Sequence, residues 1–328
     1  MEKVLEIKDL QTNFYTHDGI VRGCDHVSYT VNKGETLAVV GESGSGKSVT
    51  ALSILRLVPN PPGKIDGGEI WFNGRDLLTL SDKEIQAIRG NEIAMIFQEP
   101  MTSLNPVLRV GEQIAESIFL HQPAMSKDKT RQRVIELLTQ VGISAPDSRV
   151  DEYPHQLSGG MRQRIMIAMA LACNPALLIA DEPTSALDVT IQAQILRLID
   201  DLKRQLGMAV IMITHDLGVV AETADRVAVM YAGKIVEYGH VNDIFDNPKH
   251  PYLIGLKRSM PTIDTDTDEL YAIPGMVPNP TNLPEGCKFA PRCDQCMSVC
   301  ESQEPPVVDI SEDHYARCWL YQSEGKIL

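Results

Sequence analysis

The chain has 328 residues, which exceeds one average domain and predicts one large domain with an appendage, or two domains. Its 30 basic and 44 acidic residues give a net charge of −14, and such an acidic surface repels phosphates, so nucleic acid is not an expected partner. No apolar run approaches the roughly 18 residues that a membrane span needs, and the N-terminus lacks the apolar core of a signal peptide, so we expect a cytosolic chain.

The chain alternates strand and helix patterns. Its first strands alternate apolar and polar residues, whereas the later strands are continuous apolar runs, as in a buried parallel sheet. Each apolar run adjoins a helical pattern, and this alternation predicts an α/β fold. The predicted strands are 4–7, 25–31, 36–40, 176–180 and 210–214, and the predicted helices are 49–57, 163–172 and 191–206.

Two segments depart from this alternation. Residues 100–174 are mostly helical in pattern, so we expect a helical subdomain inserted into the α/β core. After residue 250 the periodicity fades, and seven prolines lie between Pro274 and Pro306. We therefore predict a main domain over residues 1–250 and a C-terminal domain over residues 251–328.

The segment 41–48 reads Gly-Glu-Ser-Gly-Ser-Gly-Lys-Ser and fits the phosphate-binding pattern G-x-x-x-x-G-K-S. It follows a predicted strand and precedes a predicted helix, which favours a P-loop over a solvated Gly/Ser-rich turn. Lys47 is expected to reach the β- and γ-phosphates of a nucleotide, and the Ser48 hydroxyl to bind Mg²⁺. The predicted nucleotide-binding residues here are Gly41, Glu42, Ser43, Gly44, Ser45, Gly46, Lys47, Ser48 and Val49.

Two carboxylates follow the apolar strand 176–180. Asp181 and Glu182 stand at its C-terminal end, where a parallel sheet presents ligand-binding residues. Asp181 is suited to hold Mg²⁺, and Glu182 to polarise an attacking water. A surface Asp-Glu pair at a strand end is the alternative, and the P-loop favours the catalytic interpretation.

The segment 157–161, Leu-Ser-Gly-Gly-Met, lies between these motifs and resembles the signature of ABC ATPases. Ser158 and the N–H groups of Gly159 and Gly160 head a predicted helix, which makes a second anion-binding helix end. The resemblance implies an ABC-type P-loop NTPase cassette, with a RecA-like α/β core, an antiparallel β subdomain and an inserted helical subdomain. In this family the signature of one subunit faces the P-loop of another, so that ATP clamps a dimer and hydrolysis releases it.

Further positions match motifs of the same family. By resemblance, Gln98 belongs to the Q-loop and contacts Mg²⁺ or the attacking water, and Asp188 belongs to the D-loop at the dimer interface. His215, after the strand 210–214, resembles the switch histidine that contacts the γ-phosphate. An aromatic before the P-loop stacks on adenine in this family, and Tyr15 is our choice over Phe14, although both could belong to the sheet core.

Three segments resemble the oligopeptide/dipeptide importer branch, and specifically the first of its two non-identical ATPase subunits. They are residues 98–106, residues 153–157 and the run His250-Pro251-Tyr252, together with the Cys-containing tail. The resemblance implies hydrolysis of Mg-ATP to power peptide uptake. The implied partners are a second ATPase subunit, two transmembrane permeases and an extracytoplasmic peptide-binding protein, with this chain on the cytoplasmic face of the cell membrane.

The tail carries five of the seven cysteines, at C-x5-C, C-x2-C and C-x3-C spacings that suit zinc or an iron–sulfur cluster. Relatives with this tail can bind a [4Fe–4S] cluster, and the family pattern selects four of the five as ligands, with Cys296 as an extra. Buried free thiols are the alternative, and the spacing alone allows zinc. The selected ligands are Cys287, Cys293, Cys300 and Cys318, whereas Cys24 and Cys173 are assigned to the core.

Other functions fit parts of this pattern. The same motor could import nickel or another small solute, although nickel importers often lack such a tail. A soluble ABC ATPase of DNA repair or translation usually carries two cassettes or a long coiled coil, and neither is evident here. A redox sensor with regulatory nucleotide binding has no need of Glu182 as a water-polarising carboxylate.

Overall fold

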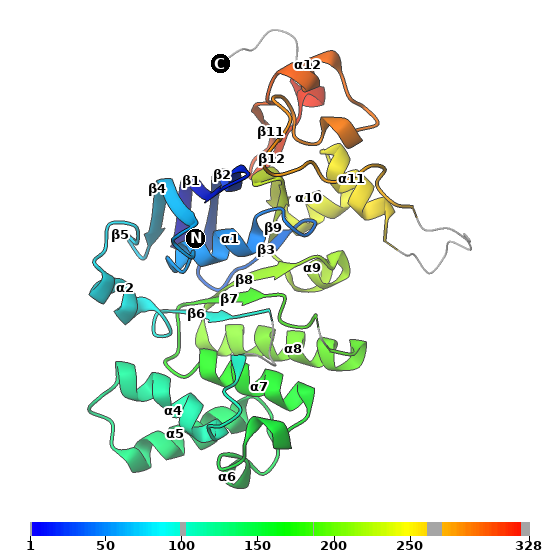
Figure 1. Ribbon diagram of the computed structural model, residues 1–328. Coiled ribbons are helices and arrows are strands. Elements are labelled where there is room, and N and C mark those ends of the chain that lie inside the picture. Colours follow the sequence, from blue (N-terminus) through cyan, green and yellow to red (C-terminus); the bar gives the residue numbers. More distant parts are fainter. Residues whose placement is uncertain (1, 99–102, 186, 261–270, 323–328) are drawn as a thin grey trace. The chain divides into compact units, whose positions relative to one another are not determined.

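The computed structural model describes residues 2–98, 103–185, 187–260 and 271–322 (Figure 1). The chain divides into two compact units. The first comprises residues 1–4, 31–35 and 76–212, and the second comprises residues 5–30, 36–75 and 213–328.

The first unit places helices around short parallel strands. β6 (Ile93–Ile96) pairs in parallel with β7 (Leu177–Asp181), and β8 (Ala209–Thr214) lies on the other side of β7. The described residues between β6 and β7 form helices and no strand, as expected for 100–174. The helices of this unit are α2 (Asp82–Ile88), α4 (Val110–His121), α5 (Lys127–Gln140), α6 (Pro146–Arg149), η1 (Pro154–Gln156), α7 (Gly159–Ala170) and α8 (Val189–Leu206).

Packing within this unit centres on α7. It contacts α4 and α5 as well as β6 and α8, and the green helices of Figure 1 show this group. The α8 sequence repeats apolar residues at helical spacing, with Ile195, Ile199 and Leu202 buried. Gly207, at φ 63°, ends α8 in the left-handed conformation that glycine adopts without strain.

The second unit contains two groups of strands. In one, with order β2-β1-β4-β5, β1 (Lys3–Thr16) pairs antiparallel with β4 (Gly63–Phe72). In the other, β3 (Thr36–Val40) pairs in parallel with β9 (Arg226–Tyr231), and antiparallel strands continue from β9 in the order β10-β12-β11. The remaining strands are β2 (Gly19–Asn32), β5 (Arg75–Asp76), β10 (Lys234–His240), β11 (Val307–Ser311) and β12 (His314–Arg317).

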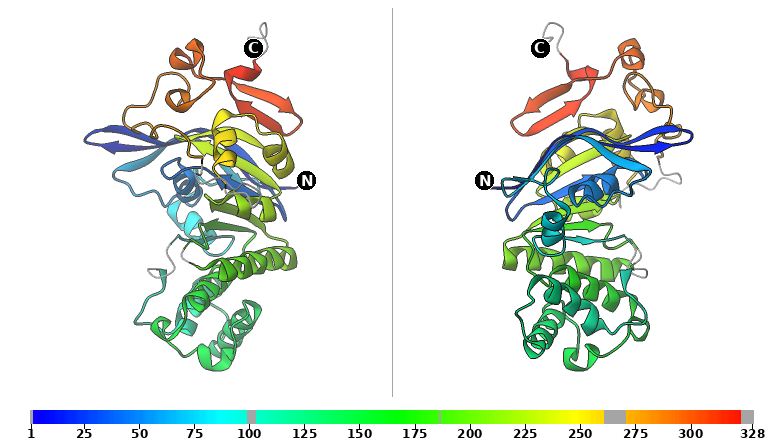
Figure 2. Two further views of the ribbon diagram at one scale, coloured as in Figure 1. Left: turned by 90° about the vertical axis from the view of Figure 1, so that its right-hand side faces the viewer. Right: turned by 60° about the vertical axis from the view of Figure 1, so that its left-hand side comes forward.

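The C-terminal region is packed into the core of the second unit. Tyr252, Leu253 and Phe289 belong to the same buried cluster as Val40 of β3 and Val229 of β9. Figure 2 shows the red strands β11 and β12 next to the strands of this unit, as the β10–β12 pairing requires. The helices of this unit are α1 (Lys47–Ile54), α9 (Leu217–Thr223), α10 (Val241–Asp246), α11 (Pro251–Arg258), η2 (Ala290–Arg292), α12 (Ser298–Ser302) and η3 (Trp319–Tyr321).

Buried charges also fix this region. The Glu237 carboxylate is fully buried, where it accepts N–H groups from Lys249 and His250 and lies 3.0 Å from His314 Nε2 of β12. Lys234 of β10 pairs with Glu304 at 2.6 Å. Glu304 is exposed, so the buried-pair argument applies to Glu237: removing His314 would leave the buried carboxylate with one partner fewer, and this contact holds β12 against β10.

The predicted elements agree in place and differ in length. The strands predicted at 4–7 and 25–31 extend to 14 residues each, because their exposed faces are polar and carry no apolar signal. β4 to β6 and β9 to β12 were not predicted, and neither were α2, α9, α10 or the helices after residue 250. No helix of the described segments is long and apolar enough to cross a membrane.

Candidate functional site

The phosphate-binding loop joins β3 to α1. All five residues of β3 are buried, which fixes the start of the loop, and α1 begins at Lys47. Gly41 (φ 153°) and Gly46 (φ 104°) both lie in the region that favours glycine, and a Cβ at Gly46 would approach the carbonyl oxygen of Gly23 to 2.2 Å. These positions therefore require glycine, and the loop wraps tightly enough for its N–H groups to face an anion at the α1 N-terminus.

Two buried side chains of the loop, Lys47 and Ser45, carry polar groups that could bind an anion. Lys47 is buried, and its ammonium donates hydrogen bonds to the carbonyl oxygens of Gly41 (2.8 Å) and Glu42 (3.0 Å). The Ser45 hydroxyl is buried and makes no hydrogen bond within the described residues. A buried hydroxyl without a partner is costly in a folded protein, and a phosphate oxygen would satisfy it. Ser48, the predicted Mg²⁺ ligand, and Val49 are half-buried in the first turn of α1.

Phe14 and Tyr15, the two candidates for stacking on adenine, are consecutive residues of β1 with different surroundings. Phe14 is half-buried, and its ring lies near Gly23 and Gly63. Gly63 of β4 is its partner in the sheet. Tyr15 is 49% exposed, and its hydroxyl donates to Asp66 at 2.7 Å. This hydrogen bond raises the pKa of Tyr15, and the hydrogen bonds of Lys64, Asn13 and Tyr15 lower the pKa of Asp66 to about 2. Tyr15 thus has the more accessible ring.

His215 follows β8 directly and is exposed. The next residue, Asp216, caps α9 by accepting the N–H groups of Gly218 (2.8 Å) and Val219 (3.3 Å). This cap fixes the backbone at the end of β8, so the position of His215 is set by its neighbour.

In the first unit, two predicted catalytic residues are in contact. Asp181 ends β7 and is buried, and Glu182 follows at φ 46°, a left-handed conformation that is strained for a glutamate. The Gln98 side-chain amide donates to the Glu182 carboxylate at 2.9 Å. Residues 99–102 of the predicted Q-loop lie outside the described residues. The contact brings together an amide and a carboxylate that both suit the orientation of a water molecule.

The signature segment starts α7. Ser158 is its N-cap, with the hydroxyl accepting the N–H of Met161 at 3.4 Å, and Gly159 is exposed with no atom within 4 Å of a Cβ built there. Gly160 is half-buried against Ile191. Asp188 is the N-cap of α8 and accepts the N–H of Ile191 at 3.0 Å, so it has a structural role beside the predicted one. The neighbouring Ala186 lies outside the described residues.

The tail cysteines line one small cavity. Cys287, Cys293, Cys300 and Cys318 border a space of about 10 Å³, together with His250 and Phe289, whereas Cys296 is exposed and lies outside it. Burial raises the pKa of Cys287, Cys293 and Cys318 to about 11. Among the described residues, no three His, Cys, Asp or Glu side chains form a group that could hold a metal ion.

Two residues that contact the phosphate-binding loop were not predicted from the sequence. Arg292 and Tyr252, both from the C-terminal region, hold Glu42 by its side chain and its backbone N–H. In the sequence, Tyr252 belongs only to the run His250-Pro251-Tyr252, and Arg292 belongs to none of the motifs. A separation of more than 200 residues leaves no local pattern from which these contacts could be predicted.

The chain resembles known proteins along nearly its whole length. The profile of the family described as "ABC transporter" matches residues 24–185, and that of "Oligopeptide/dipeptide transporter, C-terminal region" matches residues 236–300. The oligopeptide transport ATP-binding protein OppD of Bacillus subtilis is 56% identical over 98% of this chain and 90% of its own length. The dipeptide transport ATP-binding protein DppD of Lactococcus lactis is 52% identical over 97% and 91%.

Two solved structures of ATP-binding cassettes are similar to this chain in fold. The ATP-binding cassette MJ0796, dimeric and bound to ADP and phosphate, has a TM-score of 0.65 and 29% identity, over 72% of this chain and 98% of its own. The cassette cbiO1 of Clostridium perfringens has a TM-score of 0.64 and 26% identity, over 75% and 92%. These likenesses confirm the predicted P-loop cassette fold. The chain belongs to the ABC transporter ATP-binding subunits, in the oligopeptide/dipeptide branch of that family.

Proposed function

We propose that this chain hydrolyses Mg-ATP to drive the uptake of peptides through a membrane importer. The geometry of the phosphate-binding loop is the observation that carries the proposal. Its glycines Gly41 and Gly46 leave no room for a Cβ, Lys47 is buried, and the Ser45 hydroxyl has no hydrogen-bond partner among the described residues. The peptide class is supported by the relatives, whose names include oligopeptide and dipeptide transport.

Each motif residue then has one task. Lys47 would exchange its backbone acceptors for the β- and γ-phosphates, and Ser48 and Asp181 would hold the Mg²⁺ that neutralises phosphate charge. Glu182 accepts a hydrogen bond from the attacking water, which Gln98 helps to orient from its contact with the Glu182 carboxylate. His215 contacts the γ-phosphate, and Tyr15 stacks on adenine.

The signature residues act on a second nucleotide. Ser158 and Gly159 are exposed and Gly160 is half-buried at the start of α7, and binding to the ATP of a partner chain requires such access. We infer a second ATPase subunit as this partner, with Asp188 at the dimer interface. Two permeases and an extracytoplasmic peptide-binding protein complete the importer, and this chain would sit at the cytoplasmic face of the membrane.

Replacing the loop lysine tests nucleotide binding. We expect Lys47→Ala to weaken binding of a fluorescent ATP analogue by at least about a hundredfold, because charge-assisted hydrogen bonds to two phosphates are lost. Lys83→Ala, an exposed lysine of α2, is the control and should bind as the unmodified chain does. Equal binding by Lys47→Ala would remove the loop from the nucleotide site.

We also propose a [4Fe–4S] cluster held by Cys287, Cys293, Cys300 and Cys318. The shared cavity and the exposure of Cys296 support this choice of four. The space of about 10 Å³ is too small for a cluster, so the tail segments would have to open around it. Such a cluster would tie together the loops of the tail, and ATP hydrolysis needs no electron from it.

Metal content distinguishes this cluster from zinc or free thiols. Protein purified without oxygen should contain about four irons per chain and show broad visible absorbance. We expect Cys293→Ser to lose most of the iron, and Cys296→Ser to keep it. One zinc per chain, or equal iron in both variants, would contradict the ligand assignment.

A further inference from the structure

Glu42, the second residue of the phosphate-binding loop, is held by the C-terminal region at two points. The Arg292 guanidinium donates to both carboxylate oxygens of Glu42, at 2.7 and 3.1 Å. The Glu42 backbone N–H donates to the Tyr252 hydroxyl at 2.8 Å. Two residues more than 200 positions away therefore fix both the side chain and the peptide plane of this loop residue.

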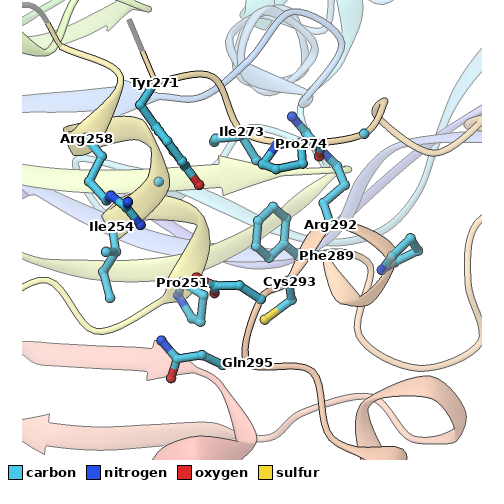
Figure 3. Close-up of a pocket in the computed structure, with 14 residues that line it drawn as sticks. Pro251, Ile254, Arg258, Tyr271, Ile273, Pro274, Phe289, Arg292, Cys293 and Gln295 are labelled. Atoms are coloured by element: carbon cyan, nitrogen blue, oxygen red, sulfur yellow. The ribbon is translucent and has the colours of Figure 1, made fainter. Parts of the chain in front are cut away.

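The groups that hold Glu42 are themselves fixed. The Arg292 side chain is 5% exposed and also donates to the Tyr231 hydroxyl (3.3 Å) and the Pro274 carbonyl (3.2 Å). The Tyr252 ring is fully buried against Tyr231 and Phe289, at centroid distances of 4.7 and 5.4 Å. Figure 3 shows Arg292 next to Phe289 and Pro274 at the wall of a pocket. A bidentate pair between such a buried guanidinium and a carboxylate is strong and directional.

The third contact of Glu42 involves the nucleotide-binding lysine. Lys47 donates to the Glu42 carbonyl, and it must give up this bond to reach a phosphate. The loop then keeps its shape only through contacts that do not involve Lys47. Arg292 and Tyr252 supply two such contacts, one to the Glu42 carboxylate and one to its backbone N–H.

We propose that Arg292 and Tyr252 are positioning residues, through which the C-terminal region keeps the phosphate-binding loop in the shape that ATP requires. Neither residue touches the nucleotide, and both act through Glu42. The inference rests on the proposed function, since it requires that this loop binds ATP. Pre-organisation of this kind favours binding because the loop pays less ordering entropy when the ligand arrives.

Conservative substitutions test the two contacts in the full-length chain. Arg292→Lys keeps the charge and loses the bidentate geometry, and Tyr252→Phe removes only the hydroxyl acceptor. We expect Arg292→Lys to weaken binding of a fluorescent ATP analogue about tenfold, a typical coupling between sites, and Tyr252→Phe severalfold. Hydrolysis should show a raised KM for ATP with kcat nearly unchanged, because the reacting groups remain in place.

Arg258→Lys is the matched control. Arg258 lines the same pocket as Arg292 and lies over the Tyr271 ring at 4.2 Å, and no hydrogen bond from it to the loop is present among the described residues. It should bind the analogue as the unmodified chain does. An equal loss in Arg258→Lys and Arg292→Lys would indicate general destabilisation and overturn the proposal.

A double-mutant cycle shows whether Arg292 acts through Glu42. If it does, Arg292→Lys combined with Glu42→Gln should bind no more weakly than the weaker-binding single variant. Additive losses would contradict the proposal. If the unmodified chain binds no nucleotide, the proposed function fails. If the unmodified chain binds nucleotide and both Arg292→Lys and Tyr252→Phe bind it as tightly, only the positioning role fails.

Discussion

At the scale of single residues, backbone geometry distinguishes the functional positions. Gly41 and Gly46 adopt conformations in which a Cβ would collide with a carbonyl, and Glu182 adopts a strained one without being glycine. The motif predicts which residues these are, because each glycine has a fixed place in the pattern. The Glu182 conformation and its hydrogen bond from Gln98 depend on tertiary packing, so the sequence could not show them.

A buried histidine gives a pH dependence at this scale. Burial lowers the pKa of His250 to about 3, and its Nδ1 accepts the Tyr252 N–H at 3.1 Å, which requires the neutral ring. In the unfolded chain a histidine has a pKa of about 6.5, so only the unfolded state binds the proton between these values. The contribution of His250 to stability is complete above pH 6.5 and is lost as the pH falls toward 3, by about 1.4 kcal/mol per pH unit.

Urea unfolding at pH 7.5 and 5.5 measures this effect. His250→Asn keeps an acceptor for the Tyr252 N–H and cannot take up the proton, so its free energy of unfolding should fall less between the two pH values. The control is His17→Asn. The His17 side chain is 93% exposed, so this variant should retain the full decrease in the free energy of unfolding. The same decrease in His250→Asn would show that another group titrates.

At the scale of elements, caps decide where helices start. Ser81 forms a capping box with Glu84 at the start of α2, where each side chain accepts the other's backbone N–H. The sequence of this segment contains the Ser-x-x-Glu pattern, which is sufficient to predict this helix start. Short strands such as β6 and β9 are harder to predict from sequence, since a short, mostly apolar run of four to six residues does not distinguish a strand from a buried helix.

The α2 cap yields a stability prediction. Ser81→Ala should lower the free energy of unfolding by about 1 kcal/mol, because the Glu84 N–H loses its acceptor, whereas Ser81→Asp should cost little. Urea denaturation at pH 7 measures the difference. Equal losses in both variants would mean that the capping interaction contributes nothing.

At the scale of the whole molecule, the alternation of strand and helix patterns predicted the class of fold, and the sequence motifs predicted the family. The division at residue 250 stays a prediction. Tyr252, Leu253 and Phe289 nevertheless share the buried cluster of β3 and β9, and three pairs join the C-terminal region to the rest of its unit: Glu237–His314, Lys234–Glu304 and Glu42–Arg292. Proline-rich sequence without periodicity hid this packing, because each contact is long-range and each element is short. The net charge is acidic, yet the proposed phosphate site would offer positive charge locally through Lys47 and the N-terminus of α1.

Hydrolysis by Glu182→Gln tests the central claim most directly. The variant should bind ATP as tightly as the unmodified chain and lose turnover by about a hundredfold or more, because the amide cannot accept the proton of the attacking water. Glu222→Gln, an exposed residue of α9, serves as the control and should hydrolyse ATP normally. The measurement is steady-state phosphate release by the chain together with its partner ATPase subunit. Undiminished release by Glu182→Gln would contradict the assignment of this chain's catalytic carboxylate.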